Sequence, residues 1–248
     1  MVRRPLTRLA LGLAIGLCAA ASANATTFAD FSPTNSDANL AWTSTGPASG
    51  ALATIGAGAS ANVYFSFLNP GVNSLHGLDA VFTLTATSNQ AATLSGSGNL
   101  NQDNVNGSFS FVYSGATPLV LGGHTYLTGA NLLSGVYSGA NLVGPAGGGT
   151  TSFQNSTLAG GVITYTSDFE TFTGGPRGFS LALTSVIPSL SATPGSSLDS
   201  FTGVADGSFR AGVPEPATWA LMLIGIGGVG GLARRRASRV PAAATVVV

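Results

Sequence analysis

The sequence contains no lysine, and charged residues make up only 7% of it. Its formal net charge of zero hides an asymmetry, because seven of the nine arginines lie before residue 26 or after residue 212. Between these limits eight acidic residues stand against only Arg177 and Arg210, which gives this central region a net charge of −6. Such a region repels a phosphate backbone, so nucleic-acid binding is excluded as its function.

Cysteine occurs once, at Cys18, and histidine twice, at His76 and His124. Without cysteine the central region has no disulfide, so a hydrophobic core and sheet hydrogen bonds have to stabilise it. Two scattered histidines do not provide the ligands that zinc or iron prefer, and we expect no metal and no cofactor. Neither histidine stands beside a recognisable nucleophile and no G-x-S-x-G segment occurs, so we expect two surface loop histidines and no enzyme.

Residues that favour helices are scarce in the central region, which is rich in Ser, Thr, Gly, Asn and Ala. Phe109, Phe111 and Tyr113 alternate with smaller residues, a period of two that places the aromatic rings on the core face of a strand. Strand patterns recur between turn residues, at residues 62–68, 80–87, 108–113, 131–137, 158–166, 178–186 and 197–209. This spacing predicts an all-β domain, an antiparallel β-sandwich or a partly open barrel.

A solenoid is the alternative fold, because a short Gly-Ala-Asn-Leu segment occurs at residues 129–132 and again at residues 139–142. Two copies do not make a stack of repeats. We therefore expect the two copies to lie at the ends of two adjacent strands of a meander.

The first residues have the form of a secretory signal peptide. Three arginines in the first eight residues precede an apolar stretch, residues 9–21. Ala23 and Ala25 then form the A-x-A pattern of a signal-peptidase site. We expect the secretory translocon to export the chain and signal peptidase to remove residues 1–25, so that the mature protein begins at Thr26.

A second apolar stretch, residues 217–233, contains no charged side chain. As a helix it would be roughly 25 Å long, near the lower limit for crossing a bilayer. Trp219 near its start suits the headgroup level, and the arginines that follow hold the far end in the cytoplasm by the positive-inside rule. The sequence thus predicts a transmembrane helix with the central domain outside the membrane.

Pro214 and Pro216 restrict the backbone and lack an N–H donor, so residues 213–216 are expected to be extended, with Glu215 exposed. The order Pro-Glu-Pro-Ala-Thr-Trp-Ala, apolar stretch and arginine cluster closely resembles a PEP-CTERM sorting signal of the PEPxxWA variety. The resemblance implies a Gram-negative host and an exosortase, a membrane cysteine peptidase that would cleave near Pro214 to Pro216 and pass the protein on to the cell surface. The sorting-motif residues are Pro214, Glu215, Pro216, Trp219, Arg234, Arg235 and Arg236.

Three polar segments are candidate binding sites with simpler explanations. Asp168 and Glu170 are the one close carboxylate pair, and on a strand they would share a solvated face with Phe169 turned inward. Residues 99–107 carry oxygen ligands at alternate positions, as a calcium-binding EF-hand loop does at its start, but lack its glycine and its glutamate. We expect a polar hairpin loop there. Residues 83–87 place three threonines on one strand face, as is common in sheets.

The expected organisation is a signal peptide (residues 1–25), an exported β domain (26–212), a sorting signal (213–236) and a short cytoplasmic tail (237–248). The leading hypothesis is a non-enzymatic protein of the cell surface or the extracellular matrix, associated with a biofilm and its exopolysaccharide. A carbohydrate-binding, lectin-like module is the alternative, which exposed aromatics in a groove would favour. A secreted hydrolase is third, and it would need a pocket that joins His76 or His124 to Asp168 or Glu170.

Overall fold

A computed structural model describes residues 25–69, 72, 75–172 and 174–212, and every strand pairing among them is antiparallel. The strands are β1 (Ala25–Pro33), β2 (Leu40–Gly46), β3 (Ser49–Thr54), β4 (Ala61–Phe67), β5 (Leu78–Ser88), β6 (Thr93–Leu94), β7 (Asn99–Tyr113), β8 (Leu119–Leu121), β9 (His124–Tyr126), β10 (Asn131–Pro145), β11 (Thr151–Ser156), β12 (Val162–Thr166), β13 (Arg177–Ile187) and β14 (Phe201–Gly212). One 3-10 turn, η1 (Thr157–Ala159), is the only helical element of the described residues. The prediction of an all-β antiparallel domain is confirmed.

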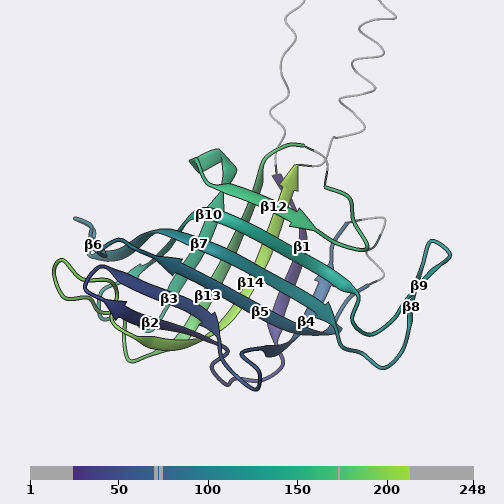
Figure 1. Cartoon of the computed structure of the whole chain (residues 1–248), viewed down its shortest axis with the longest axis horizontal. Helices are drawn as coiled ribbons and strands as arrows, with labels where there is room; N and C mark the ends of the chain where they lie inside the picture. Colours follow the sequence, from purple (N-terminus) through teal and green to yellow (C-terminus); the bar gives the residue numbers. More distant parts are fainter. Residues whose placement is uncertain (1–24, 70–71, 73–74, 173, 213–248) are drawn as a thin grey trace, which may run out of the picture. The chain divides into compact units, whose positions relative to one another are not determined.

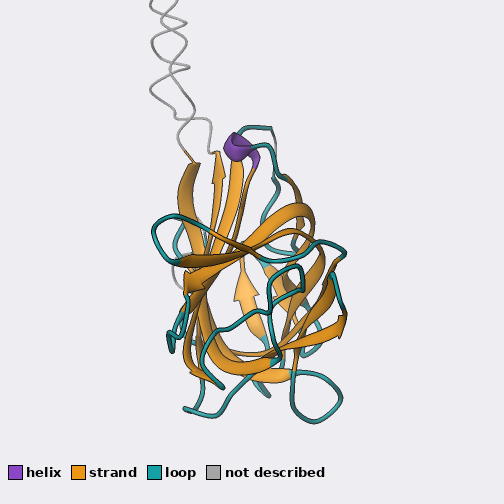
Figure 2. Cartoon of the chain, turned by 90° about the vertical axis from the view of Figure 1, so that its left-hand side faces the viewer, coloured by secondary structure: helices purple, strands orange, loops and turns teal. Residues whose placement is uncertain are grey.

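The main sheet closes on itself. The path β1–β4–β5–β7–β10–β11–β13–β14 returns to its start because β14, the last strand, pairs with β1, the first. Figure 1 shows the long strands β7, β10, β13 and β14 crossing the molecule, and Figure 2 shows the strands curving around one interior. The sheet is therefore closed rather than partly open. The solenoid alternative is wrong, because in a solenoid each repeat would contact only its neighbours.

Two pairs of strands lie side by side between β5 and β14: β4 with β1, and β3 with β2. On one edge of β5, β4 pairs with residues 78–82 and β3 with residues 85–88. On the facing edge of β14, β1 pairs with residues 207–212 and β2 with residues 201–203. The long strands are thus covered along both edges, which removes the unpaired edges that promote aggregation.

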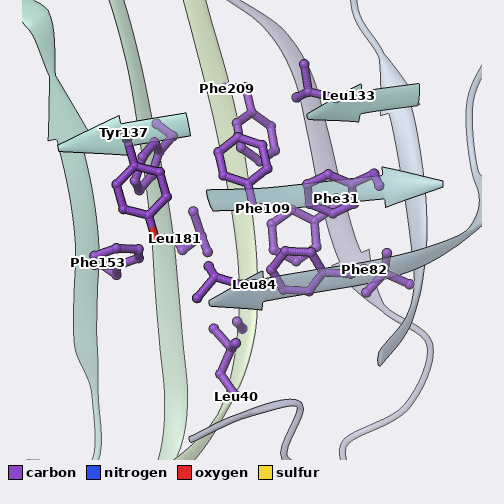
Figure 3. Packing of buried hydrophobic residues seen from close by; sticks show 14 of the residues in the cluster. Phe31, Leu40, Phe82, Leu84, Phe109, Leu133, Tyr137, Phe153, Leu181 and Phe209 are labelled. Carbon is purple, nitrogen blue, oxygen red and sulfur yellow. The ribbon is translucent and has the colours of Figure 1, made fainter. Parts of the chain in front are cut away.

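The interior is filled by aromatic rings, several of which are labelled in Figure 3. Phe111 lies at the centre of this cluster, with its ring centroid 4.6 Å from Phe82, 4.9 Å from Phe31 and 5.0 Å from Phe65. Phe109 and Tyr113, the other aromatics of β7, are also buried. The predicted period of two in this strand is confirmed.

Buried polar side chains connect segments that are distant in sequence. Gln102 is fully buried, and its Nε2 donates to the backbone oxygen of Gln90 at 2.6 Å while its Oε1 accepts from the backbone N–H of Leu198 at 3.1 Å. Asn39 similarly bonds both the N–H and the carbonyl of Ala205 in β14. These contacts satisfy the amides, which would otherwise be costly to bury.

Three local predictions are wrong. Residues 99–107 belong to β7 and form no hairpin loop, because their polar side chains face outward or, like Gln102, find buried partners. The two Gly-Ala-Asn-Leu copies flank and enter one long strand, β10, rather than two strands. Asp168 and Glu170 follow β12 instead of lying on a strand, although Phe169 does turn inward and packs against Phe67 with ring centroids 5.6 Å apart.

Candidate functional site

The residues of the predicted sorting and cleavage sites lie almost entirely outside the described part of the chain. Ala23 precedes it and Ala25 is its first residue. Pro214, Glu215, Pro216, Trp219, Arg234, Arg235 and Arg236 all follow it. No helix of the described ranges has the length and apolar character that a membrane crossing needs, and the predicted span at residues 217–233 lies beyond those ranges.

The two predicted processing points adjoin one pair of strands. Ala25, after which signal peptidase is expected to cut, is the register partner of Gly212 at the end of β14. Pro214 follows Gly212 by only two positions, so no spacer separates the last strand from the sorting motif. The first and last residues of the described range are therefore paired with each other in the sheet.

The structure describes all four residues named for a hydrolase, His76, His124, Asp168 and Glu170. His76 and His124 are exposed, and within the described ranges no hydrogen bond joins either histidine to Asp168 or Glu170. Asp168 instead accepts from the backbone N–H of Asn131 at 2.7 Å. Glu170 accepts from the side-chain amide of Asn69 at 3.1 Å. Both carboxylates thus accept hydrogen bonds from residues that are distant in the chain.

A metal centre is not formed by the described residues, among which no group of three or more His, Cys, Asp or Glu could hold an ion. In the segment that was compared with an EF-hand, Asn101 donates to Asp103 at 2.8 Å along the strand. The three threonines of β5 do share the outer face, and Thr83 hydrogen-bonds Ser110 of β7 at 2.7 Å.

A groove of about 660 Å³ with polar side chains lies on the outer face of β10, β11, β13 and β14, and we call it the arginine groove. Ser156, Gly178 and Arg210 are consecutive register partners across β11, β13 and β14. Because Gly178 has no side chain, the face is recessed between its two neighbours. Asn141, Gln154 and Ser180 form the next row across the sheet and line one side. The turn η1, which carries Leu158 and Ala159, lines another side.

Both cationic side chains of the exported domain line this groove. Arg210 is exposed, and no hydrogen bond of its side chain occurs within the described ranges. Arg177 is half-buried, and its guanidinium donates to the carbonyls of Ile163 at 3.2 Å and Phe172 at 3.3 Å. Arg177 thus anchors the end of the sheet, whereas Arg210 remains available to a ligand.

The inner side of the groove contains unusual buried polar atoms. Asn155 Oδ1 and Arg177 Nε are buried and have no hydrogen-bond partner among the described residues. Nearby, Tyr165 donates to the carbonyl of Gly178 at 2.6 Å. Burial raises the pKa of Tyr165, and the charge of Arg177 opposes that rise, so the phenol stays a neutral donor.

A second, more open depression of about 540 Å³ lies next to the arginine groove and shares Ser180 with it. It is lined by the carboxylates Asp30 and Asp206 and by Ser208. Aromatic side chains are not exposed in the arginine groove, where the lining Phe179 is only 3% exposed. The exposed aromatics that would favour a lectin-like site are therefore not among the described groove residues.

Sequence reasoning counted Arg177 and Arg210 but proposed no site for them. They lie far apart in the chain, and only the pairing of β13 with β14, in which Gly178 faces Arg210, brings them to one groove. The signal in the sequence was their rarity. The only two cations of an acidic domain are candidates for an anion-binding site.

Comparison with known proteins supports the sorting motif and nothing else along the chain. No curated protein and no solved structure matches the chain. The family model of the PEP-CTERM protein-sorting motif matches residues 212–237, which begin at the last residue of β14. These residues include the Pro214, Glu215, Pro216 and Trp219 on which the resemblance was based. The chain therefore carries a PEP-CTERM protein-sorting motif directly after a closed antiparallel β domain.

Proposed function

We propose that this chain is a non-enzymatic surface or extracellular-matrix protein of a Gram-negative bacterium. The single observation that carries the proposal is the PEP-CTERM motif at residues 212–237, which indicates export and membrane-associated sorting. In this proposal residues 217–233 first anchor the chain in the inner membrane. An exosortase-like peptidase then cleaves near Pro214 to Pro216 and releases the domain to the cell surface.

The geometry of the β domain supports an ordered maturation. Strand β1 starts at Ala25, and its first residues pair with the last residues of β14. Proteases bind extended, unpaired backbone, so signal peptidase would cut after Ala25 before this pairing forms. Strand β14 immediately precedes the sorting motif and reaches the far side of the membrane last. Closure of the sheet would therefore follow signal-peptide removal and precede release at the motif.

A scaffold or binding role fits the described side chains better than catalysis does. The exposed histidines have no carboxylate partner within the described ranges, and Asp168 and Glu170 are engaged by Asn131 and Asn69. The tightly packed aromatic interior favours a durable module that functions outside the cell without a disulfide. Its proposed partners are the secretory translocon, signal peptidase, an exosortase-like peptidase and exopolysaccharide.

The test is intact mass spectrometry and membrane fractionation of the full chain in a host with the exosortase-like peptidase and in a strain without it. We expect a form that starts at Thr26 and ends near Pro214 to Pro216, outside the inner membrane, only when the peptidase is present. The variant Glu215→Gln should reduce this processing. The matched variant Glu170→Gln makes the same chemical change away from the motif and should be processed normally.

Retention of the complete C-terminal segment in the inner membrane of both strains would contradict the sorting proposal. The protein would then be a permanently anchored periplasmic domain.

A carbohydrate-binding module is the second candidate function. The observation that favours it is the arginine groove, whose volume of about 660 Å³ is within the range of small-molecule binding sites. A secreted hydrolase remains the third candidate and lacks a comparable observation.

A further inference from the structure

We propose that the arginine groove binds a carboxylate-bearing sugar unit of an acidic polysaccharide. This inference deepens the proposed function and rests on it, because export to the cell surface is what would bring the domain to such a polymer. Binding itself depends only on the described domain. The groove is formed by the ends of β11, β13 and β14 with the turn η1, and Arg210 stands at its rim.

Charge is the first argument for an anionic ligand. The exported domain has a net charge of −6, yet its only two cations, Arg177 and Arg210, line the same groove. Arg210 forms no hydrogen bond within the described ranges, so its guanidinium can meet a carboxylate with two parallel N–H donors. A negatively charged surface around one positive rim also directs an anion to that rim and away from the rest of the domain.

Two buried polar atoms near the groove are not available to the ligand. Asn155 Oδ1 and Arg177 Nε have no hydrogen-bond partner among the described residues, but protein atoms cover both, and Asn155 Oδ1 lies against Gly161. Arg177 precedes Gly178 on β13, so its side chain leaves the opposite side of the sheet from Arg210, and its guanidinium bonds the carbonyls of Ile163 and Phe172. The contact with the ligand carboxylate therefore falls to Arg210.

The remaining walls suit a polyhydroxylated ligand. Asn141, Gln154 and Ser180 present amide and hydroxyl groups in one row across β10, β11 and β13. Leu158 of η1 also lines the groove and is 77% exposed, so it offers an apolar side chain. Sugars carry hydroxyls on their edges and C–H groups on their faces, so this pairing of a polar row with an aliphatic side chain can replace aromatic stacking.

One lining residue is negatively charged and would repel the ligand carboxylate, so it determines which way the sugar lies in the groove. Asp103 also lines the groove, and its carboxylate already accepts from the Asn101 amide at 2.8 Å. We infer that the sugar carboxylate lies at the Arg210 end, while Asp103 accepts from hydroxyls. Replacing Asp103 by Asn should therefore strengthen the binding of an acidic sugar by about twofold, because a like charge is removed at a partly exposed site.

The test is calorimetric titration of the full chain, purified in detergent micelles, with a mannuronate hexamer and with the neutral maltohexaose. We expect binding of the mannuronate hexamer that weakens at higher salt, and little binding of maltohexaose. Arg210→Gln should weaken binding by about tenfold, since it removes a charge-assisted bidentate contact. Urea unfolding of each variant checks that the domain remains folded.

A charge-matched double variant separates the groove from the overall field. Asp37 lies in an exposed turn outside the groove, where it pairs with Asn35. Combining Asp37→Asn with Arg210→Gln restores the net charge of the domain without restoring the guanidinium. Persistent loss of binding in the double variant supports the groove, and recovery of binding overturns it.

Equal binding of maltohexaose and the mannuronate hexamer, or no binding of the hexamer by the folded wild-type chain, also overturns the proposal. These results differ from a failure of the sorting proposal. A chain that stays in the inner membrane but binds the hexamer contradicts sorting alone. A chain that is cleaved and released but does not bind contradicts this inference alone.

Discussion

Replacing Gly50 by alanine tests the packing of the one tryptophan in the exported domain. Trp42 is 1% exposed, and its indole N–H donates to the carbonyl of Leu198 at 3.0 Å. Gly50 on β3 lies directly beneath the indole, and a β-carbon there would be 2.1 Å from Cζ2 and 2.5 Å from Cε2. These separations are far below contact distance, so the indole or the strand must move.

The expected cost follows from two destabilising effects and one that partly offsets them. Overpacking a core typically costs about 1–3 kcal/mol. A shift of the indole that breaks its bond to Leu198 adds about 1–3 kcal/mol for the unsatisfied groups. The lower backbone entropy of alanine in the unfolded chain returns about 0.4–1 kcal/mol. We therefore expect Gly50→Ala to lower the free energy of unfolding by about 2–4 kcal/mol, a large part of the 5–15 kcal/mol that is typical of a domain.

The assay is urea unfolding of the full chain in detergent, monitored by tryptophan fluorescence in a Trp219→Phe background so that only Trp42 reports. With a denaturant dependence of about 2 kcal/mol per M, the midpoint should fall by about 1–2 M. Gly96→Ala is the matched control, because a β-carbon at Gly96 meets nothing within 4 Å and its φ is not positive. Equal midpoints for the Gly50 and Gly96 variants would refute the close packing of Trp42 on Gly50.

Three further variants test buried polar groups by urea unfolding. Burial raises the pKa of Tyr137, so the phenol stays neutral in the folded protein at a pH where it ionises in the unfolded chain. The folded protein therefore loses stability as the pH rises above about 10, and it does not lose this contribution below that pH. The Tyr137 hydroxyl is buried and has no partner among the described residues, so Tyr137→Phe should raise stability at pH 7 and raise it further at pH 11, where the wild-type fold also opposes ionisation of the phenol. An equal effect at both pH values would contradict this. Tyr165→Phe removes the bond to the Gly178 carbonyl and should cost about 1 kcal/mol at pH 7, so no loss would argue against that bond. Asn39→Ala removes both bonds to Ala205 and should cost about 2–4 kcal/mol, whereas a loss below about 0.5 kcal/mol would show that they contribute little.

Some features of the fold were predictable because they depend on neighbouring residues. The alternation of Phe109, Phe111 and Tyr113 predicts a strand with one buried face, and the structure confirms it. The polar segment 99–107 misled the same reasoning, because nothing local indicates that Gln102 is satisfied by Gln90 and Leu198. Strands β1 and β2 pair with the two ends of β14 along one edge. Their sequences show no clear alternation of apolar and polar residues, and these strands were not predicted.

The candidate sites divide in the same way. A sorting signal is recognised as a linear segment, so the order of Pro214, Glu215, Pro216, Trp219 and the arginines sufficed to identify it, and the family model matches those residues. The arginine groove could not be identified from the chain alone. Gly178 faces Arg210 and Ser156 only because β11, β13 and β14 pair in one register, and a shift by one residue would turn these side chains to the opposite face.

The amino-acid sequence by itself determined where the protein is directed and that its body is made of strands, since hydropathy, proline and two-residue periodicity act over a few neighbouring residues. Only the tertiary structure decided that the sheet closes through β1 and β14, that the domain's two cations line one groove, and that the buried Asn155 amide bonds the carbonyl of Ser138. These properties arise from long-range register and packing, in which residues far apart in the chain become neighbours.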